Sequence, residues 1–185
     1  MTELHADALR TLQGWTAPDT HQEAWRAQYV GHLEAHPDGL EKACYPDHLT
    51  AGALVLSNDG SQVLLNLHRK AQRWFAFGGH LEPEDSTLAG AALREATEES
   101  GLLDLVLDPA PVHLSLHAVD FCSPRGPVRH LDVRFLAQLG ATSEPVVSDE
   151  SLDVRWFPVD ELPTDEADMV DLIGLARARL ATGRR

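Results

Sequence analysis

Apolar residues occur in strand-like runs through much of this chain, separated by turns rich in Gly, Pro, Asn and Asp. Such runs predict strands at residues 48–57, 62–68, 74–77, 102–107, 112–122, 128–139 and 152–157. Asn58-Asp59-Gly60 predicts a hairpin turn between the first two, because Gly can supply a positive φ. Residues 128–139 alternate cleanly, so His130, Asp132 and Arg134 share one face of their strand.

A helical period of apolar residues marks four other segments, at residues 4–12, 20–35, 88–100 and 164–180. Thr20 and Glu23 fit a capping box at the start of the second segment. A hydroxyl from Ser86 or Thr87 can cap the third, and Gly101 ends it. The many Ala residues of this third helix predict close packing against a sheet.

The helical residues 1–46 precede the strands, and we expect them to form an extension to a domain at 47–185. Three roles are open for this extension. It can pack on the domain, form the contact of a homodimer, or cover the entrance to a substrate site.

Residues 78–102 read GGHLEPEDSTLAGAALREATEESGL and carry charged residues at fixed helical spacing. At about 100° per residue, Glu95, Glu98 and Glu99 fall within roughly 100° of arc on one helix. Like charges at the i,i+4 spacing of Glu95 and Glu99 repel, and a bound cation removes that penalty. Because carboxylates are hard oxygen ligands, this arrangement predicts Mg²⁺ or Mn²⁺ rather than zinc.

The same glutamates also fit a solvated helix face on which Arg94 pairs with Glu98 at i,i+4. The full pattern R-E-x-x-E-E-x-G argues against that interpretation, because it fixes five residues that each occur at about 6–7%. Chance then produces it about once in a million starting positions.

The pattern resembles the Nudix box, G-x5-E-x7-R-E-U-x-E-E-x-G-U, in which U is aliphatic. Gly79 matches the first Gly, and residues 94–102 match the whole second half. Asp85 stands where Glu is usual, and eight residues rather than seven separate it from the Arg, so the acidic loop is one residue longer. Whether Glu82, Glu84 or Asp85 supplies the loop-side carboxylate is open.

The resemblance to the Nudix family extends over roughly residues 47–182. It implies an α/β/α sandwich with a mixed sheet between the box helix and the final helix. It also implies metal-dependent hydrolysis of a nucleoside diphosphate linked to another group, or of a related diphosphate. Glu95, Glu98, Glu99 and the Gly78 carbonyl would hold Mg²⁺ or Mn²⁺. In an alternative role that the resemblance also implies, Glu98 would accept the proton of the attacking water rather than bind the ion. Arg94 would hold the glutamates in position.

Composition narrows the choice of partners. A length of 185 residues, with 43% apolar and 24% charged residues, fits one globular domain. The formal charge of −14 argues against a nucleic-acid groove, but it allows a small anionic ligand that a metal helps to hold.

We find no apolar run of about 18 residues and no secretory signal. With Cys44 and Cys122 far apart, we expect free thiols in a cytoplasmic protein.

A basic and aromatic cluster in this acidic chain is the candidate substrate contact, and it contains Arg69, Lys70, Arg73 and Trp74. The basic side chains can meet substrate phosphates, and Trp74 can stack on a base. The cluster is equally compatible with a solvated loop beside a core Trp.

The polar face of residues 128–139 either faces solvent or lines the substrate pocket, and His130 is its candidate contact. Zinc binding by His113, His117 and His130 is not expected, because no H-x-x-x-H helix and no thiol partner support it. Glu150, in the polar loop at residues 140–151, is a further candidate for the catalytic base or an additional metal ligand.

Two other functions are compatible with the pattern. A ligand-sensing or regulatory Nudix domain would have lost turnover, which the intact glutamates argue against. A Nudix-fold isopentenyl diphosphate isomerase would need a catalytic cysteine, and neither Cys44 nor Cys122 has a matching context. We therefore expect a pyrophosphohydrolase acting on a small diphosphate or nucleotide, with the attached group undetermined.

Overall fold

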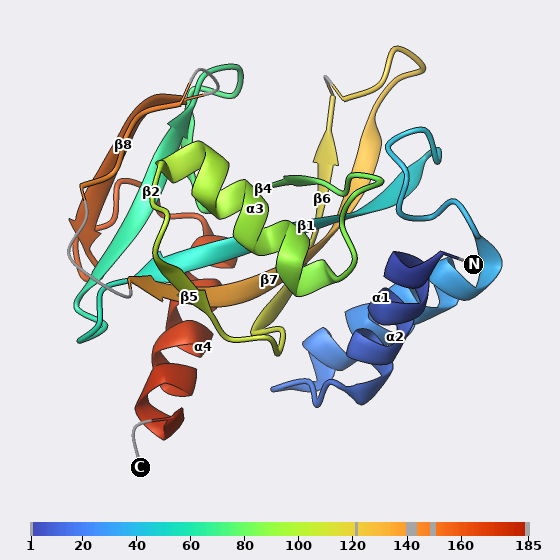
Figure 1. The fold of residues 1–185 in the computed structure, drawn as a ribbon, viewed down its shortest axis with the longest axis horizontal. Coiled ribbons are helices and arrows are strands. Elements are labelled where there is room, and N and C mark those ends of the chain that lie inside the picture. The colour runs from blue at the N-terminus through green and yellow to red at the C-terminus, as the bar shows by residue number, and fades with distance from the viewer. Residues whose placement is uncertain (1, 121, 140–143, 149–150, 184–185) are drawn as a thin grey trace.

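A mixed sheet of eight strands forms the centre of the protein (Figure 1). The computed structural model describes residues 2–120, 122–139, 144–148 and 151–183. Within these ranges the strands are β1 (Asp47–Leu56), β2 (Gln62–His68), β3 (Arg73–Phe75), β4 (Phe77–His80), β5 (Leu105–Leu107), β6 (His113–Val119), β7 (Val128–Leu139) and β8 (Ser151–Pro158).

Strand β1 organises the sheet because three strands pair with it. It runs parallel to β7 from Asp47, opposite Arg129, to Leu56, opposite Gln138. It runs antiparallel to β2 at one end and to β4 near the other. The remaining strands extend the sheet outward, with β3 and β8 on β2 and with β5 and β6 on β7.

Helices cover both faces of this sheet (Figure 1). They are α1 (Glu3–Gly14), α2 (Thr20–Ala35), α3 (Leu88–Ser100) and α4 (Ala167–Gly183). The core between the sheet and α1, α2 and α3 is separate from the core that α4 closes. The expected α/β/α sandwich, with the box helix and the final helix on opposite faces, is confirmed.

The alternation along β7 shows how the sequence fills both cores. Leu131, Val133 and Phe135 point into the core that α3 covers. Leu136 points the other way, into the core that contains Leu172 of α4. The period of two residues in a strand places these side chains on opposite faces of the sheet, as the sequence predicted.

The N-terminal helices pack on the sheet through polar contacts as well as apolar ones. The side-chain amide of Gln22 donates to the Leu114 carbonyl at 3.0 Å and accepts from the Leu114 N–H at 2.7 Å. The Tyr29 hydroxyl donates to the Ser115 carbonyl at 2.5 Å. These helices therefore bind the outer edge of β6, and packing on the domain is the role that the contacts establish.

Two local predictions were wrong by a small shift. The residue that caps α2 is Asp19, whose carboxylate accepts from the Gln22 N–H, so Thr20 is the first helical residue rather than the cap. The predicted strand at 74–77 is divided into β3, which pairs with β2, and β4, which pairs with β1. Each shift reflects tertiary pairing that local spacing does not encode.

Replacing Gln22 by Ala should destabilise the protein, because the buried N–H and C=O of Leu114 would lose their partners. We expect the free energy of unfolding to fall by about 1–3 kcal/mol, measured by urea denaturation. Gln28→Ala is the matched control, since Gln28 lies exposed on the same helix and should change stability by less than about 0.5 kcal/mol. Equal effects of the two substitutions would contradict the proposed role of Gln22.

Candidate active site

Helix α3 positions Glu95, Glu98 and Glu99, and residues at both of its ends fix where the helix begins and stops. Its N-cap is Thr87, whose hydroxyl accepts from the Gly90 N–H at 3.0 Å. Asp7 of α1 adds a second acceptor for this end, taking the Leu88 N–H at 2.9 Å. Gly101 ends the helix with φ at 70°, a conformation that glycine adopts without a steric penalty. The glutamates therefore occupy the last two turns, as the sequence predicted.

Two of the glutamates converge on the glycine pair, Gly78 and Gly79, within β4. The Gly78 N–H donates to Glu99 Oε2 at 3.0 Å, and Asn66 Nδ2 donates to the same oxygen at 3.4 Å. A Cβ atom on Gly79 would lie 2.7 Å from the Glu95 carboxylate. The backbone can approach both carboxylates this closely because Gly79 has no side chain. Asn66 was missed in the sequence because it sits within an apolar strand.

Arg94 neutralises part of the negative charge of the glutamate carboxylates. It contacts Asp85 through two nitrogens, with distances of 3.1 Å from Nε and 2.9 Å from Nη2. Its Nη1 lies 3.0 Å from Glu95 and 3.2 Å from Glu98. The Asp85 side chain is only 7% exposed and that of Arg94 21%. Of the three acidic residues in the longer loop, Asp85 is therefore the one that engages the box arginine most closely.

The three glutamates differ in exposure. The Glu95 side chain is 15% exposed and the Glu98 side chain 59%, while Glu99 is buried. The site thus offers two carboxylates held against the backbone and a third that reaches solvent. Such a division suits a metal site in which one carboxylate remains available to a water molecule.

The predicted substrate residues lie around the β2–β3 hairpin. Arg69 donates to the Ser151 carbonyl at 3.1 Å, Lys70 is exposed, and Arg73 forms an ion pair with Glu166. Trp74 packs against Phe157, with ring centroids 4.7 Å apart, on the sheet face that α4 covers. The structure therefore places Trp74 across the sheet from the core of α3.

The polar face of β7 does not face solvent. Asp132 accepts from the Thr50 hydroxyl at 3.0 Å and from Arg134 at 2.7 Å, and Arg134 also contacts Asp168 of α4 at 2.6 Å. The side chains of Asp132 and Arg134 are 14% and 13% exposed. Burial raises the pKa of Asp132, but the charge of Arg134, the neighbouring His117 and the hydrogen bonds from Arg134 and Thr50 together outweigh it and hold that pKa below its usual value.

His130 lies in a group of four side chains that the sequence analysis did not assemble, together with His48, His80 and Cys122. Cys122 Sγ is 3.4 Å from His130 Nε2. For His130, the expectation that no thiol accompanies the histidine was therefore wrong. The four residues come from distant parts of the chain, so no local spacing signals them. Glu150, the remaining candidate, lies outside the described residues.

The chain was compared with protein families and with solved structures. The NUDIX domain model matches residues 46–174, and no curated protein matches. An Ap4A hydrolase from C. elegans has 21% identity and a TM-score of 0.58, with 72% of this chain and 98% of that chain covered. The NUDIX domain of Shewanella oneidensis NrtR, complexed with ADP ribose, has 22% identity and a TM-score of 0.53, covering 76% and 92%.

These similarities agree with the architecture described above. An ADP-ribose pyrophosphatase from Streptococcus suis also has this fold, with 22% identity, a TM-score of 0.50 and coverage of 74% and 92%. The class of protein is defined by this architecture, an α/β/α sandwich, together with the acidic box helix. Because the domain model matches more than half of the residues, the chain belongs to the Nudix hydrolase family. Among the described residues, no helix is long and apolar enough for a membrane crossing.

The buried pair of Asp85 and Arg94 should make stability depend on pH. Burial raises the pKa of Asp85, but hydrogen bonds from Arg94 and the Glu82 N–H outweigh it and leave that pKa below its usual value. The stabilisation is therefore complete above the unfolded-state pKa, near 4, and is lost as the pH falls through the folded-state value.

Asp85→Asn should accordingly lower the free energy of unfolding by about 1–3 kcal/mol at pH 7. The difference from the wild type should narrow as the pH falls below about 4. Urea denaturation across this pH range measures both effects. Glu84→Gln, in the exposed part of the same loop, is the control and should stay within about 0.5 kcal/mol of the wild type. A gap that does not change with pH would argue against the ion pair.

Proposed function

We propose that this Nudix protein is a divalent-metal-dependent pyrophosphohydrolase that cleaves a nucleoside diphosphate linked to another group, or a related diphosphate. The observation that carries the proposal is the convergence of Glu95 and Glu99 on Gly78 and Gly79. Two carboxylates one helical turn apart repel each other. A cation bound between them and the substrate would offset this repulsion.

The donor set fits Mg²⁺ or Mn²⁺, because carboxylate and carbonyl oxygens are the ligands that these hard cations prefer. Glu95, Glu99 and the Gly78 carbonyl are the residues that would hold the ion. When bound, such an ion neutralises phosphate oxygens and lowers the pKa of a coordinated water. The buried position of Glu99 suits a ligand that must keep one orientation.

The protein side chains divide the remaining tasks. Arg94 holds Glu95 and Glu98 by hydrogen bonds of 3.0 and 3.2 Å, which fixes their orientation by charge-assisted contacts. Glu98 is exposed enough to meet a water molecule, and we assign it the proton of the attacking water. Glu150 remains the next candidate for that role.

The substrate is assigned by class rather than by name. The solved relatives include an Ap4A hydrolase and an ADP-ribose pyrophosphatase, which supports a nucleotide with a diphosphate linkage. Arg69, Lys70 and Arg73 would meet its phosphates.

We place this activity in the cytoplasm, because Cys44 and Cys122 are free thiols and thiols persist in a reducing compartment. A homodimer stays a prediction. The apolar residues of α1 and α2 that lie in the core are already covered by the same chain.

The decisive test is a hydrolysis panel with Mg²⁺ and with Mn²⁺. It includes ADP-ribose, NADH, diadenosine polyphosphates, nucleoside triphosphates, nucleotide sugars and CoA. Glu98→Gln should lower kcat by about 10²–10⁴-fold on the substrate that the wild type cleaves. Glu99→Gln should instead weaken metal activation, and Glu84→Gln should leave both unchanged.

Three results would alter the assignment. Activity that survives in Glu98→Gln would move the proton acceptor to another residue, with Glu150 the next to test. Activity that does not depend on a metal would overturn the role of the glutamates. Ligand binding without cleavage of any compound in the panel would indicate a sensor instead of an enzyme.

A further inference from the structure

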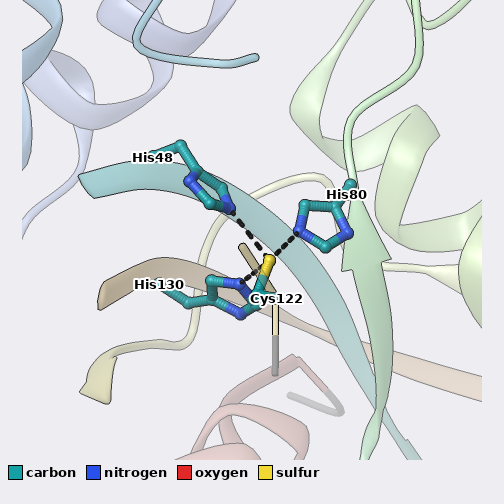
Figure 2. A group of neighbouring side chains, drawn as sticks. All are labelled: His48, His80, Cys122 and His130. Carbon is teal, nitrogen blue, oxygen red and sulfur yellow. Dashed lines mark hydrogen bonds between the residues drawn. The ribbon is translucent and has the colours of Figure 1, made fainter. Parts of the chain in front are cut away.

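Four side chains from separate segments converge beside the end of β4 (Figure 2). His48 belongs to β1, His80 is the last residue of β4, and His130 belongs to β7. Cys122 lies in the segment between β6 and β7. Because His48 is paired with His130, and His80 with Thr50, the three histidines project from one face of the sheet.

The distances match the edges of a coordination tetrahedron. Cys122 Sγ lies 3.3 Å from His80 Nε2, 3.4 Å from His130 Nε2 and 3.9 Å from His48 Nε2. All four potential ligand atoms lie within 4.8 Å of one another. For Zn–S and Zn–N bonds of about 2.3 and 2.0 Å, a tetrahedral site has S···N edges of about 3.5 Å. Only small movements of the side chains would complete such a site.

Hydrogen bonding alone accounts poorly for this arrangement. A neutral thiol has one hydrogen to donate and accepts weakly, yet three imidazole nitrogens surround the sulfur of Cys122. A metal ion would satisfy the lone pairs of all three nitrogens and a thiolate at once.

The surroundings also hold the ligands in the form that binds a metal. His48 Nδ1 is 3.2 Å from the Cys44 carbonyl. This contact places the hydrogen on Nδ1 and leaves the lone pair of Nε2 toward the group, which is the usual outer-shell pattern of metal-bound histidine.

We propose that His48, His80, Cys122 and His130 form a tetrahedral zinc site, distinct from the glutamate site. Three imidazoles and a thiolate select Zn²⁺, whereas the all-oxygen glutamate site selects Mg²⁺ or Mn²⁺. Four protein ligands leave no open position, so the ion serves structure and not catalysis.

His80 connects the histidine site to the box. The His80 carbonyl accepts from Arg94 Nη2 at 3.1 Å, and Arg94 in turn holds Glu95 and Glu98. A zinc ion on the His80 ring would fix the end of β4 against β1 and β7. It would also anchor the segment that carries Cys122 to the sheet.

The test measures metal content and ligation in the full-length protein, independently of activity. We expect elemental analysis to find one zinc per chain, retained in a large excess of Mg²⁺. Replacement by Co²⁺, which takes the same donors, should give the absorption of tetrahedral cobalt with a thiolate-to-metal charge-transfer band. Chelation should lower the melting temperature, and zinc should restore it.

Substitutions assign the ligands. Cys122→Ser and His130→Gln should each weaken zinc binding by at least about 100-fold, since even outer-shell changes cost up to that much. Cys44→Ser is the matched thiol control and should keep one zinc per chain. Glu99→Gln should also keep it, which separates this site from the glutamates and from the proposed hydrolase function.

Either of two results would overturn the proposal. The first is a cobalt-loaded wild type without the thiolate charge-transfer band, which requires no variant to fold. The second is zinc binding that persists unchanged in both Cys122→Ser and His130→Gln.

Discussion

The parallel pairing of β1 with β7 is the constraint on which the rest of the structure depends. It brings residues 47–56 against residues 129–138, although some 80 positions separate them in the sequence. Nearly every residue of β1 is buried, because helices cover both faces of the sheet. A buried strand must have its backbone groups paired, and β7, β4 and β2 supply those partners. Both candidate sites are attached to this strand.

Through β4, the strand β1 places the glycine pair where α3 can reach it. The register pairs Gly79 with Ala51, and the Glu95 carboxylate fills the space beside Gly79. Through β7, the same strand places His48 beside His130. The glutamate site offers oxygen ligands and the histidine site offers nitrogen and sulfur ligands. Because metals differ in the donor atoms they prefer, each site favours a different metal ion. The two sites meet at His80, whose carbonyl binds Arg94.

In this acidic chain, two arginines, Arg94 and Arg134, each form ion pairs with several carboxylates. Arg94 forms hydrogen bonds with Asp85, Glu95 and Glu98. Arg134 forms hydrogen bonds with both Asp132 of β7 and Asp168 of α4. Both guanidinium groups are largely removed from solvent, where unpaired carboxylates would be costly. The pairs therefore hold side chains in position where an exposed ion pair would contribute little.

The sequence by itself determined the local elements and the chemistry of the box. The limits of β2 and β7 and the Gly101 end of α3 follow from periodicity and from residue preferences that act within a few residues. The carboxylates of the box lie on one helix, so their spacing alone brings them together. Only the tertiary structure decided what distant segments share: the division of residues 73–80 between two strands, the contact of Gln22 with β6, and the position of Trp74 beside Phe157. The group of His48, His80, Cys122 and His130 is the clearest case. Sheet register brings the three histidines to one face, and register depends on pairing between strands that are remote in the chain.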